Sequence, residues 1–176
     1  CATMAKLRAG FIGAGSWATM AHLPAISKRD EVEIVAICRK GDDLLKKLAT
    51  QYGASVATED YQDVIKQNLD IIVVSSPSGL HHEHSKAALN AGAHVLCEKP
   101  MTITSADAWD LVDTAKKNDR ELLLSFGSLS LFSIFILVCL NIRFPFIIRG
   151  CIFRKPFPTI NHQHKILDYH VFGFGM

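Results

Sequence analysis

The chain has 176 residues with a net charge of +2, and 49% of them are hydrophobic. This length suits one domain with a sizeable core, and so small a charge gives no strong field for binding nucleic acid. Five cysteines without a C-x-x-C pair argue against a disulfide framework and a zinc site. The first residues form no apolar run typical of a secretory signal, so we expect a reducing, cytoplasmic compartment.

Strands and helices are expected to alternate between residues 7 and 127. Apolar segments predict strands over 7–13, 32–38, 54–58, 70–75, 94–97 and 121–127. Helices are predicted between them, over 16–29, 42–53, 60–67, 81–93 and 105–119. Pro24 should kink or shorten the first helix, and Gly53 should end the second. Asp60 should cap the third helix, and Ser105 or Thr104 the last.

Continuous apolar strands between amphipathic helices are typical of a parallel sheet covered on both faces. Ligands bind such sheets outside the carboxyl ends of the strands. One of these ends lies in "AGAHVLCEKPMT", where a short apolar run is followed at once by Glu98, Lys99 and Pro100. The charges indicate either a solvated strand end or a binding crevice, and the alternating pattern favours the crevice.

The composition changes at Gly127. Residues 1–127 hold 14 Lys and Arg against 16 Asp and Glu, whereas residues 128–176 hold five basic residues, one acid and eight of the ten Phe. We expect 5–127 to form the folded domain and 128–176 to be an apolar, basic tail of no recognisable domain, disordered or derived from a truncated or frame-shifted gene end. The uncharged run 127–142 has 16 residues, fewer than the ~20 of a spanning helix, so a membrane anchor is the weaker alternative.

A glycine motif follows the first predicted strand. In "GAGSWA", Gly13, Gly15 and Ala18 fit G-x-G-x-x-G/A. The first glycine permits a tight turn, the second lets a pyrophosphate approach the backbone, and the small third residue lets helix and strand pack closely. The start of the helix then offers N–H groups to phosphates. We expect Gly13, Gly15, Ser16, Trp17 and Ala18 to bind a dinucleotide; an ordinary glycine turn is the alternative.

The end of the second predicted strand bears on which dinucleotide binds. NAD sites usually place an acid there, and NADP sites use an Arg near the 2′-phosphate. Arg39 and Lys40 stand at this position, while Asp42 and Asp43 are better placed to cap the next helix. The pattern predicts NADP, with NAD as the other cofactor to consider. A solvated turn is the competing interpretation of the two basic residues.

"SSPSGLHHEH" follows the most apolar strand. Pro77 ends the strand, and the small side chains of Ser75 and Ser76 leave room for a flat ligand. The histidines of 81–84 do not match a standard two-histidine zinc motif, so no metal is expected. We expect Ser75, Ser76, Pro77 and His81 to lie on the cofactor side.

Residues 8–126 resemble the nucleotide-binding domain of the glucose–fructose oxidoreductase, inositol dehydrogenase and MocA family (Gfo/Idh/MocA). The pieces that carry the resemblance are "GFIGAGSWA", "SSPSGLHHEH" and above all "ALNAGAHVLCEKPMT". The family usually reads ALEAGKHVLCEKP in that last stretch. In the second piece the family often has Asn where this chain has Ser78, whereas His81 matches the family's histidine.

The resemblance implies a Rossmann-type doubly wound parallel sheet and an NAD(P)-dependent oxidoreductase acting on sugars, polyols and related hydroxyl or carbonyl compounds. It implies that Lys99 is catalytic and lies near the nicotinamide, with Glu98 and Pro100 beside it among the cofactor-binding residues. Family members carry a second α/β domain, which residues 128–176 do not resemble, and many form homo-oligomers through it.

Two other classes of function stay open. One is a non-catalytic NADP-binding module, such as a redox sensor, which the unfamiliar tail favours for this chain alone. The other is the same module tethered to a membrane through the tail. Lys99 within an intact E-K-P piece favours the enzyme.

Overall fold

A computed structural model describes residues 5–125 and 171–172. The chain divides into two compact units, Cys1–Leu122 and Leu123–Met176, and each is described by itself. The prediction that residues 128–176 form no recognisable domain lies outside the described residues, except at 171–172.

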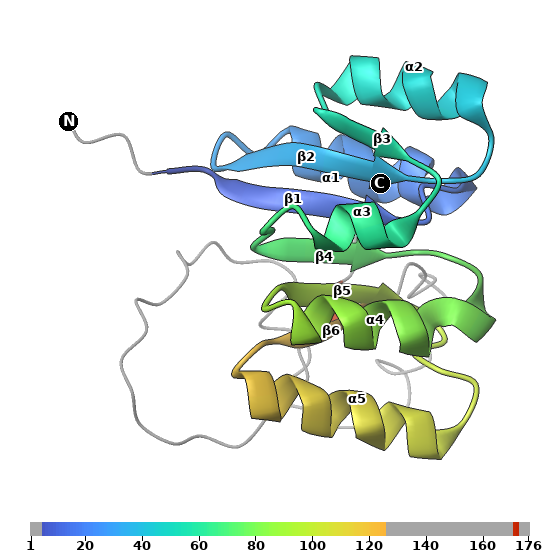
Figure 1. Cartoon of the computed structure of the whole chain (residues 1–176), viewed down its shortest axis with the longest axis vertical. Coiled ribbons are helices and arrows are strands. Elements are labelled where there is room, and N and C mark those ends of the chain that lie inside the picture. The colour runs from blue at the N-terminus through green and yellow to red at the C-terminus, as the bar shows by residue number, and fades with distance from the viewer. Residues whose placement is uncertain (1–4, 126–170, 173–176) are drawn as a thin grey trace, which may run out of the picture. The chain divides into compact units, whose positions relative to one another are not determined.

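The first unit contains a parallel sheet with the strand order β3-β2-β1-β4-β5. Its strands are β1 (Leu7–Ile12), β2 (Val32–Cys38), β3 (Val56–Thr58), β4 (Ile71–Val74) and β5 (His94–Glu98). Figure 1 shows β1 and β4 side by side in the middle of this order. The order reverses between β1 and β4, which is the switch point of a doubly wound sheet. The predicted Rossmann-type fold class is confirmed.

Helical segments follow the strands as expected. They are η1 (Ala18–His22), α1 (Leu23–Ser27), α2 (Asp42–Tyr52), α3 (Tyr61–Ile65), η2 (Ser78–Leu80), α4 (His81–Asn90) and α5 (Ser105–Asn118). β6 (Leu122–Ser125) begins at the last residue of the first unit, and in the second unit it pairs in parallel with β7 (Val171–Phe172). No helix in the described part of the chain has the length and apolar character of a membrane span.

Most of the predicted helix ends are confirmed. Asp60 caps α3 by accepting a hydrogen bond from the backbone of Gln62, and Thr104 caps α5. Gly53 ends α2 in the left-handed conformation with a φ of 69°. The expectation that Asp42 or Asp43 caps α2 is wrong. Gly41 occupies the cap position without a side-chain bond, and both acids lie in the first turn, where they face the positive end of the helix dipole.

Pro24 changes the first helix in a way that the sequence did not specify. The segment between the glycine motif and Pro24 is a π-helix, Ala18–His22, and the N–H of Leu23 bonds to the carbonyl of Ala18 five residues earlier. Proline lacks the N–H that would continue the α-helical ladder, and its ring crowds the carbonyl four residues before it. A wider turn ahead of Pro24 relieves both problems. The helix then ends at Ser27, before the predicted residue 29.

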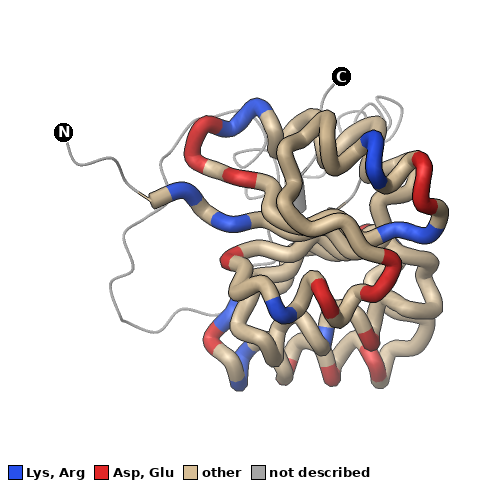
Figure 2. The backbone as a smooth tube through the Cα atoms, turned by 45° about the horizontal axis from the view of Figure 1, so that its top comes forward, with Lys and Arg blue, Asp and Glu red and all other residues tan. Residues whose placement is uncertain are grey.

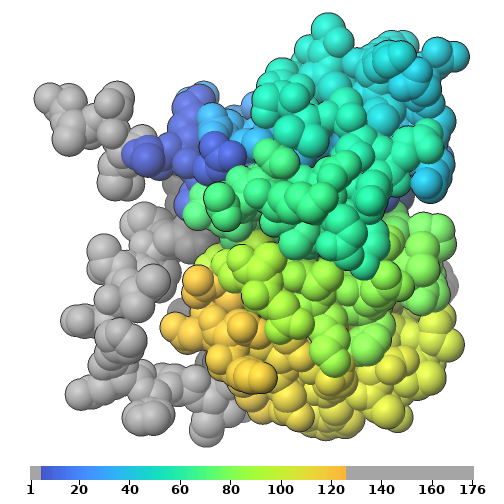
Figure 3. Space-filling model, viewed as in Figure 1, coloured from blue at the N-terminus to red at the C-terminus, as the bar shows by residue number. Residues whose placement is uncertain are grey.

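Two apolar clusters cover the two faces of the sheet. On one face, α3, α4 and α5 contribute Val64, Leu89 and Leu111 to a core that includes Ile72 and Val95 of the strands. α3 contacts α4, and α4 contacts α5; Figure 3 shows the atoms of this part of the chain in successive bands from turquoise to yellow. On the other face, α1 and α2 pack on Phe11, Ile37 and Val73 with side chains that include Leu23 and Leu48. Burial on both faces explains why the strands read as unbroken apolar runs.

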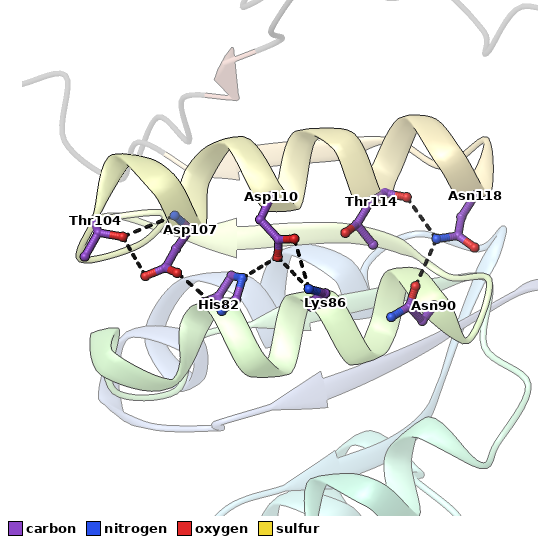
Figure 4. Close-up of polar contacts among 8 residues, drawn as sticks. All are labelled: His82, Lys86, Asn90, Thr104, Asp107, Asp110, Thr114 and Asn118. Carbon is purple, nitrogen blue, oxygen red and sulfur yellow. Dashed lines mark hydrogen bonds and ion pairs between the residues drawn. The ribbon is translucent and has the colours of Figure 1, made fainter.

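A row of polar contacts joins α4 to α5 (Figure 4). Asp110 accepts from His82 Nε2 at 2.6 Å and pairs with Lys86 Nζ at 2.8 Å. Nearer the carboxyl ends of the two helices, Asn118 of α5 donates to the side chain of Asn90 of α4 at 3.1 Å. Lys86 and then His82 lower the pKa of Asp110. Because the Asp110 side chain is 41% exposed, we expect these ion pairs to add little to the stability of the domain.

Charged residues of both signs are spread over the described part of the chain (Figure 2). In this view the segments coloured for Lys and Arg are interspersed with those coloured for Asp and Glu. This distribution lacks the continuous basic stripe by which proteins follow a phosphate backbone.

Candidate functional site

The carboxyl ends of β1, β2, β4 and β5 lie at one edge of the sheet because these strands are parallel neighbours. The predicted site residues follow these strand ends. Three segments of them meet there: the turn after β1, the end of β2 and the loop after β4. A fourth segment, after β5, carries Lys99, which the sequence analysis expects to be catalytic.

The turn after β1 is held by two neighbouring segments, the end of β2 and the loop after β4. The N–H groups of Gly13 and Ala14 donate to the carbonyl of Cys38 at 2.9 and 3.0 Å. The hydroxyl of Ser75 donates to the carbonyl of Gly13 at 2.8 Å. Gly13 has a φ of 91°, and a Cβ there would lie 2.3 Å from the backbone nitrogen of Ser76. Only glycine fits this position, as the motif predicts.

The second glycine faces open space. Only one atom, the carbonyl oxygen of Gly13 at 4.0 Å, would come within reach of a Cβ built on Gly15. Ser16 and Trp17 follow as the exposed start of the helical segment, where backbone N–H groups have no partner within a helix. Ala18, in contrast, is 1% exposed, as close packing of helix and strand requires. This arrangement fits a pyrophosphate laid over Gly15.

Arg39 lies beside the glycine turn. Its Nη1 donates to the carbonyl of Ala14 at 3.2 Å, and its Nε donates to the carbonyl of Lys40 at 3.0 Å. No carboxylate among the described residues pairs with its guanidinium, so the charge of Arg39 is available to an anion. Lys40 differs, because its exposed ammonium lies 3.8 Å from Glu59 Oε2.

Glu59 was missed by the sequence analysis. It follows β3, twenty residues after Arg39, and its other carboxylate oxygen accepts from the N–H of Gly41 at 2.8 Å. The signal was an acid directly after the short strand 56–58, but only the pairing of β3 with β2 brings it to the same edge. Glu59 offsets the charge of Lys40 and leaves Arg39 as the main cation at the end of β2.

The histidines of 81–84 have separate partners. His81 lies between two loops at this edge, with Nε2 2.7 Å from the carbonyl oxygen of Ser76 and Nδ1 2.7 Å from that of Pro100. His82 turns to α5. His84 bonds to the hydroxyl of Ser76 at 2.8 Å, and burial lowers its pKa. No group of three metal-ligating side chains forms among the residues that the structure describes.

Glu98 and Lys99 have opposite environments. Glu98, the last residue of β5, is 7% exposed, and its Oε1 lies 2.5 Å from Nε2 of the fully buried His22. Its Oε2 accepts from the backbone N–H of Lys99 at 3.2 Å. The Lys99 side chain is exposed and has no hydrogen bond or ion pair within residues 5–125. The Lys99–Pro100 bond, which the sequence left open, is cis.

His22 was also missed by the sequence analysis. It lies four residues after Ala18, on the face of the helix that packs against the sheet. That spacing marks His22 as an inward-facing residue, but its partner Glu98 is 76 residues away and could not be inferred from the pattern. The predicted contact of Glu98 with a cofactor stays a prediction.

A hollow at the other edge of the sheet is not part of this site. Its volume is about 410 Å³, and its lining includes Arg8, Val32 and Gln67, near the amino ends of β1 and β2. The Arg8 guanidinium already donates to the carbonyls of Gln67 and Asn68 and pairs with Glu33. Ligands of doubly wound sheets bind at the carboxyl edge, where the predicted residues lie.

Together, the fold and the glycine turn define an NAD(P)-binding domain of the Rossmann type. The model of an oxidoreductase family with an NAD-binding Rossmann fold, Gfo/Idh/MocA, matches residues 7–126. The chain belongs to this family.

Similar proteins include several sugar-converting enzymes. The D-glucoside 3-dehydrogenase of Escherichia coli is 37% identical over 125 residues, which are 70% of this chain and 36% of the relative. An inositol 2-dehydrogenase/D-chiro-inositol 3-dehydrogenase of Lactiplantibacillus plantarum is 32% identical over 117 residues, 65% of this chain and 32% of the relative. The chain thus spans about one third of the length of these relatives.

Solved structures with the same fold include KijD10, a 3-ketoreductase from Actinomadura kijaniata in complex with NADP. It has a TM-score of 0.67 and 27% identity, and the match covers 78% of this chain and 45% of that one. The WlbA dehydrogenase from Chromobacterium violaceum, in complex with NADH and UDP-GlcNAcA, has a TM-score of 0.64 and 31% identity, with 69% and 35% covered.

The close contact at Gly13 leads to a stability prediction. We expect Gly13→Ala to lower the free energy of unfolding by about 2 kcal/mol or more, because alanine is strained at positive φ and its Cβ meets backbone. Gly79→Ala is the matched control, since no atom lies within 4 Å of a Cβ there. Urea unfolding followed by circular dichroism measures both. Equal midpoints for the two variants would contradict the contact.

Proposed function

We propose that the chain is the dinucleotide-binding part of an oxidoreductase that transfers a hydride between the nicotinamide of NADP(H) and a sugar, a polyol or a related hydroxyl or carbonyl compound. The observation that carries this proposal is the presence at one edge of a glycine turn, an Arg39 without a carboxylate partner and an exposed Lys99. The sugar-converting enzymes among the similar proteins support the substrate class.

Each group has a separate task in this proposal. The backbone of Gly15, Ser16 and Trp17 holds the pyrophosphate, and the loop of Ser75, Ser76 and Pro77 lines the way to the nicotinamide, which accepts or returns the hydride. In the oxidative direction the amine of Lys99 accepts the hydroxyl proton of the substrate as its C–H hydride leaves and its carbonyl forms. In the reductive direction the ammonium returns that proton to the new hydroxyl.

The preference for NADP follows from the charges at the end of β2. A 2′-phosphate is a strong acceptor that suits the planar guanidinium of Arg39. Lys40 contributes less, because Glu59 lies 3.8 Å from its ammonium. The same Glu59 would repel a phosphate, so the preference is a balance in which Arg39 is the largest favourable contribution.

Arg39 therefore decides the order of affinities. We expect the chain to bind NADPH more tightly than NADH, Arg39→Asp to reverse that order, and Lys40→Ala to change it by less than about threefold. A charge-assisted bond of ~1.5–3 kcal/mol corresponds to a loss of roughly tenfold or more. Fluorescence titration with both reduced cofactors measures the effect. Tighter binding of NADH by the unaltered chain would contradict the proposal.

Lys99 should affect chemistry more than cofactor binding. We expect Lys99→Ala to leave the NADPH dissociation constant within about threefold. In a chain extended by a second domain of the family type, it should lower turnover by about 10²–10⁴-fold, the usual contribution of a general acid–base group. Lys86→Ala, which changes a lysine paired with Asp110 on α5, is the control for loss of a positive charge. A turnover loss below about tenfold would leave Lys99 without a catalytic role.

The redox-sensing alternative is weakened by the cysteines that the structure describes. Cys38 and Cys97 are both buried, and burial raises the pKa of each thiol to about 11. Sensor cysteines are exposed and have lowered pKa values, because the thiolate is the reactive form. The described cysteines therefore do not support a sensor that acts through a thiol, and their free, buried state suits the cytoplasmic compartment that we also propose.

The raised thiol pKa values predict protection from alkylation. At pH 8 a thiol with a pKa of about 11 carries roughly a hundredfold less thiolate than one at its ordinary value of 9.0. We expect iodoacetamide to leave Cys38 and Cys97 unmodified in the folded chain and to label both after denaturation in urea. Peptide mass spectrometry reports each site separately. Rapid labelling of either cysteine in the folded chain would contradict this prediction and support the redox-sensor alternative.

A further inference from the structure

A buried histidine bridges the two loops that flank the candidate site. We name the segment between β5 and α5 the Lys99 loop (residues 99–104). His81, at the first turn of α4, is 2% exposed. Its Nδ1 lies 2.7 Å from the carbonyl oxygen of Pro100 in the Lys99 loop, and its Nε2 lies 2.7 Å from the carbonyl oxygen of Ser76 after β4.

Both partners of this ring can only accept hydrogen bonds. Each ring nitrogen lies beside one carbonyl oxygen, and a nitrogen that carries a proton donates to the oxygen beside it. His81 therefore lies between the two loops and joins them through the two sides of one rigid ring. The bridge also reaches the glycine turn, because the backbone of Ser76 lies against Gly13.

A second contact holds the Lys99 loop from the first helical segment. His22, which is completely buried, lies 2.5 Å from Glu98 Oε1 through its Nε2. The other oxygen of the same carboxylate accepts from the backbone N–H of Lys99 at 3.2 Å. His22 belongs to the helical segment that begins at the glycine turn. The backbone on both sides of the Lys99 side chain is thus tied to the segments that flank that turn.

We propose that His81, together with the His22–Glu98 pair, positions the backbone of Lys99 relative to the glycine turn after β1. His81 and His22 are positioning residues in this proposal, and Lys99 is the group that meets substrate. The inference rests on the function proposed for Lys99. It assigns Glu98 to the support of the loop, with its carboxylate turned to His22.

The physical reason is the nature of the lysine itself. An exposed lysine has four flexible side-chain bonds and, within the described residues, no partner that orients its ammonium. A fixed Cα is then the main restraint on where the amine can reach. Small displacements of a catalytic group cost large factors in rate, so the loop needs support from buried groups.

Hydrogen exchange of the Lys99 loop tests the bridge without cofactor. Glutamine has no ring to place one nitrogen beside each carbonyl oxygen, and its one amide nitrogen replaces only one ring nitrogen, so His81→Gln should lose the contact with one of the two loops. We expect the amides of Lys99 and of residues 101–103 to exchange at least about tenfold faster in His81→Gln, the effect of losing one buried hydrogen bond. His82→Gln, which changes the next residue of α4 but contacts α5, should leave these rates unchanged. Equal rates in the unaltered chain and His81→Gln would overturn the proposal.

A second measurement needs no variant and covers the case in which His81→Gln does not fold. In nitrogen-15 spectra of the unaltered chain, the ring N–H of His81 should exchange slowly with solvent, because it is buried and donates to a carbonyl oxygen. A ring N–H that exchanges as fast as that of an exposed histidine would overturn the bridge. A parallel NADPH titration keeps the two proposals apart. Absent binding with a protected loop contradicts the proposed function alone, whereas binding with an unprotected loop contradicts the positioning role alone.

Discussion

The close approach of Gly13 to the backbone of Ser76 is the contact on which the carboxyl edge of the sheet depends. β1 and β4 are parallel neighbours, so the turn after one strand passes directly beside the loop after the other. A side chain on Gly13 would occupy the place of backbone atoms. Because glycine has no side chain, the carbonyls of Gly13 and Cys38 can accept hydrogen bonds that join the ends of β1, β2 and β4. Gly15 then faces open space.

The same edge separates charges that are adjacent in the chain. Glu98 is buried against His22 while Lys99 is exposed, because the side chain that ends a strand and the one that follows it leave the sheet in different directions. At the end of β2, Arg39 bonds to carbonyl oxygens and keeps its charge, whereas Lys40 lies near Glu59. Lys99 can therefore meet a ligand because Glu98 is bound to His22, and Arg39 can do so because Glu59 lies near Lys40.

The histidine-rich start of α4 shows how a helix distributes similar residues. Successive side chains of a helix point about 100° apart, so His81 faces two loops, His82 faces Asp110 on α5, and His84 bonds to Ser76. A segment whose composition suggests metal binding instead joins three parts of the fold. Two of these contacts end at Ser76, which links α4 to the glycine turn.

Local physical chemistry made much of this protein predictable from its sequence. Unbroken apolar strands, helix caps such as Asp60 and Thr104, and the strand–glycine–helix order at Gly13 each depend on residues a few positions apart, and the structure has them as expected. Only the tertiary structure decided what lies next to the site residues. Strand pairing brings Glu59 to the end of β2, and helix packing brings His22 to Glu98. Such partners are separated by 18 to 76 residues. No periodicity encodes a contact at that distance, because it arises only when separate elements pack on one sheet.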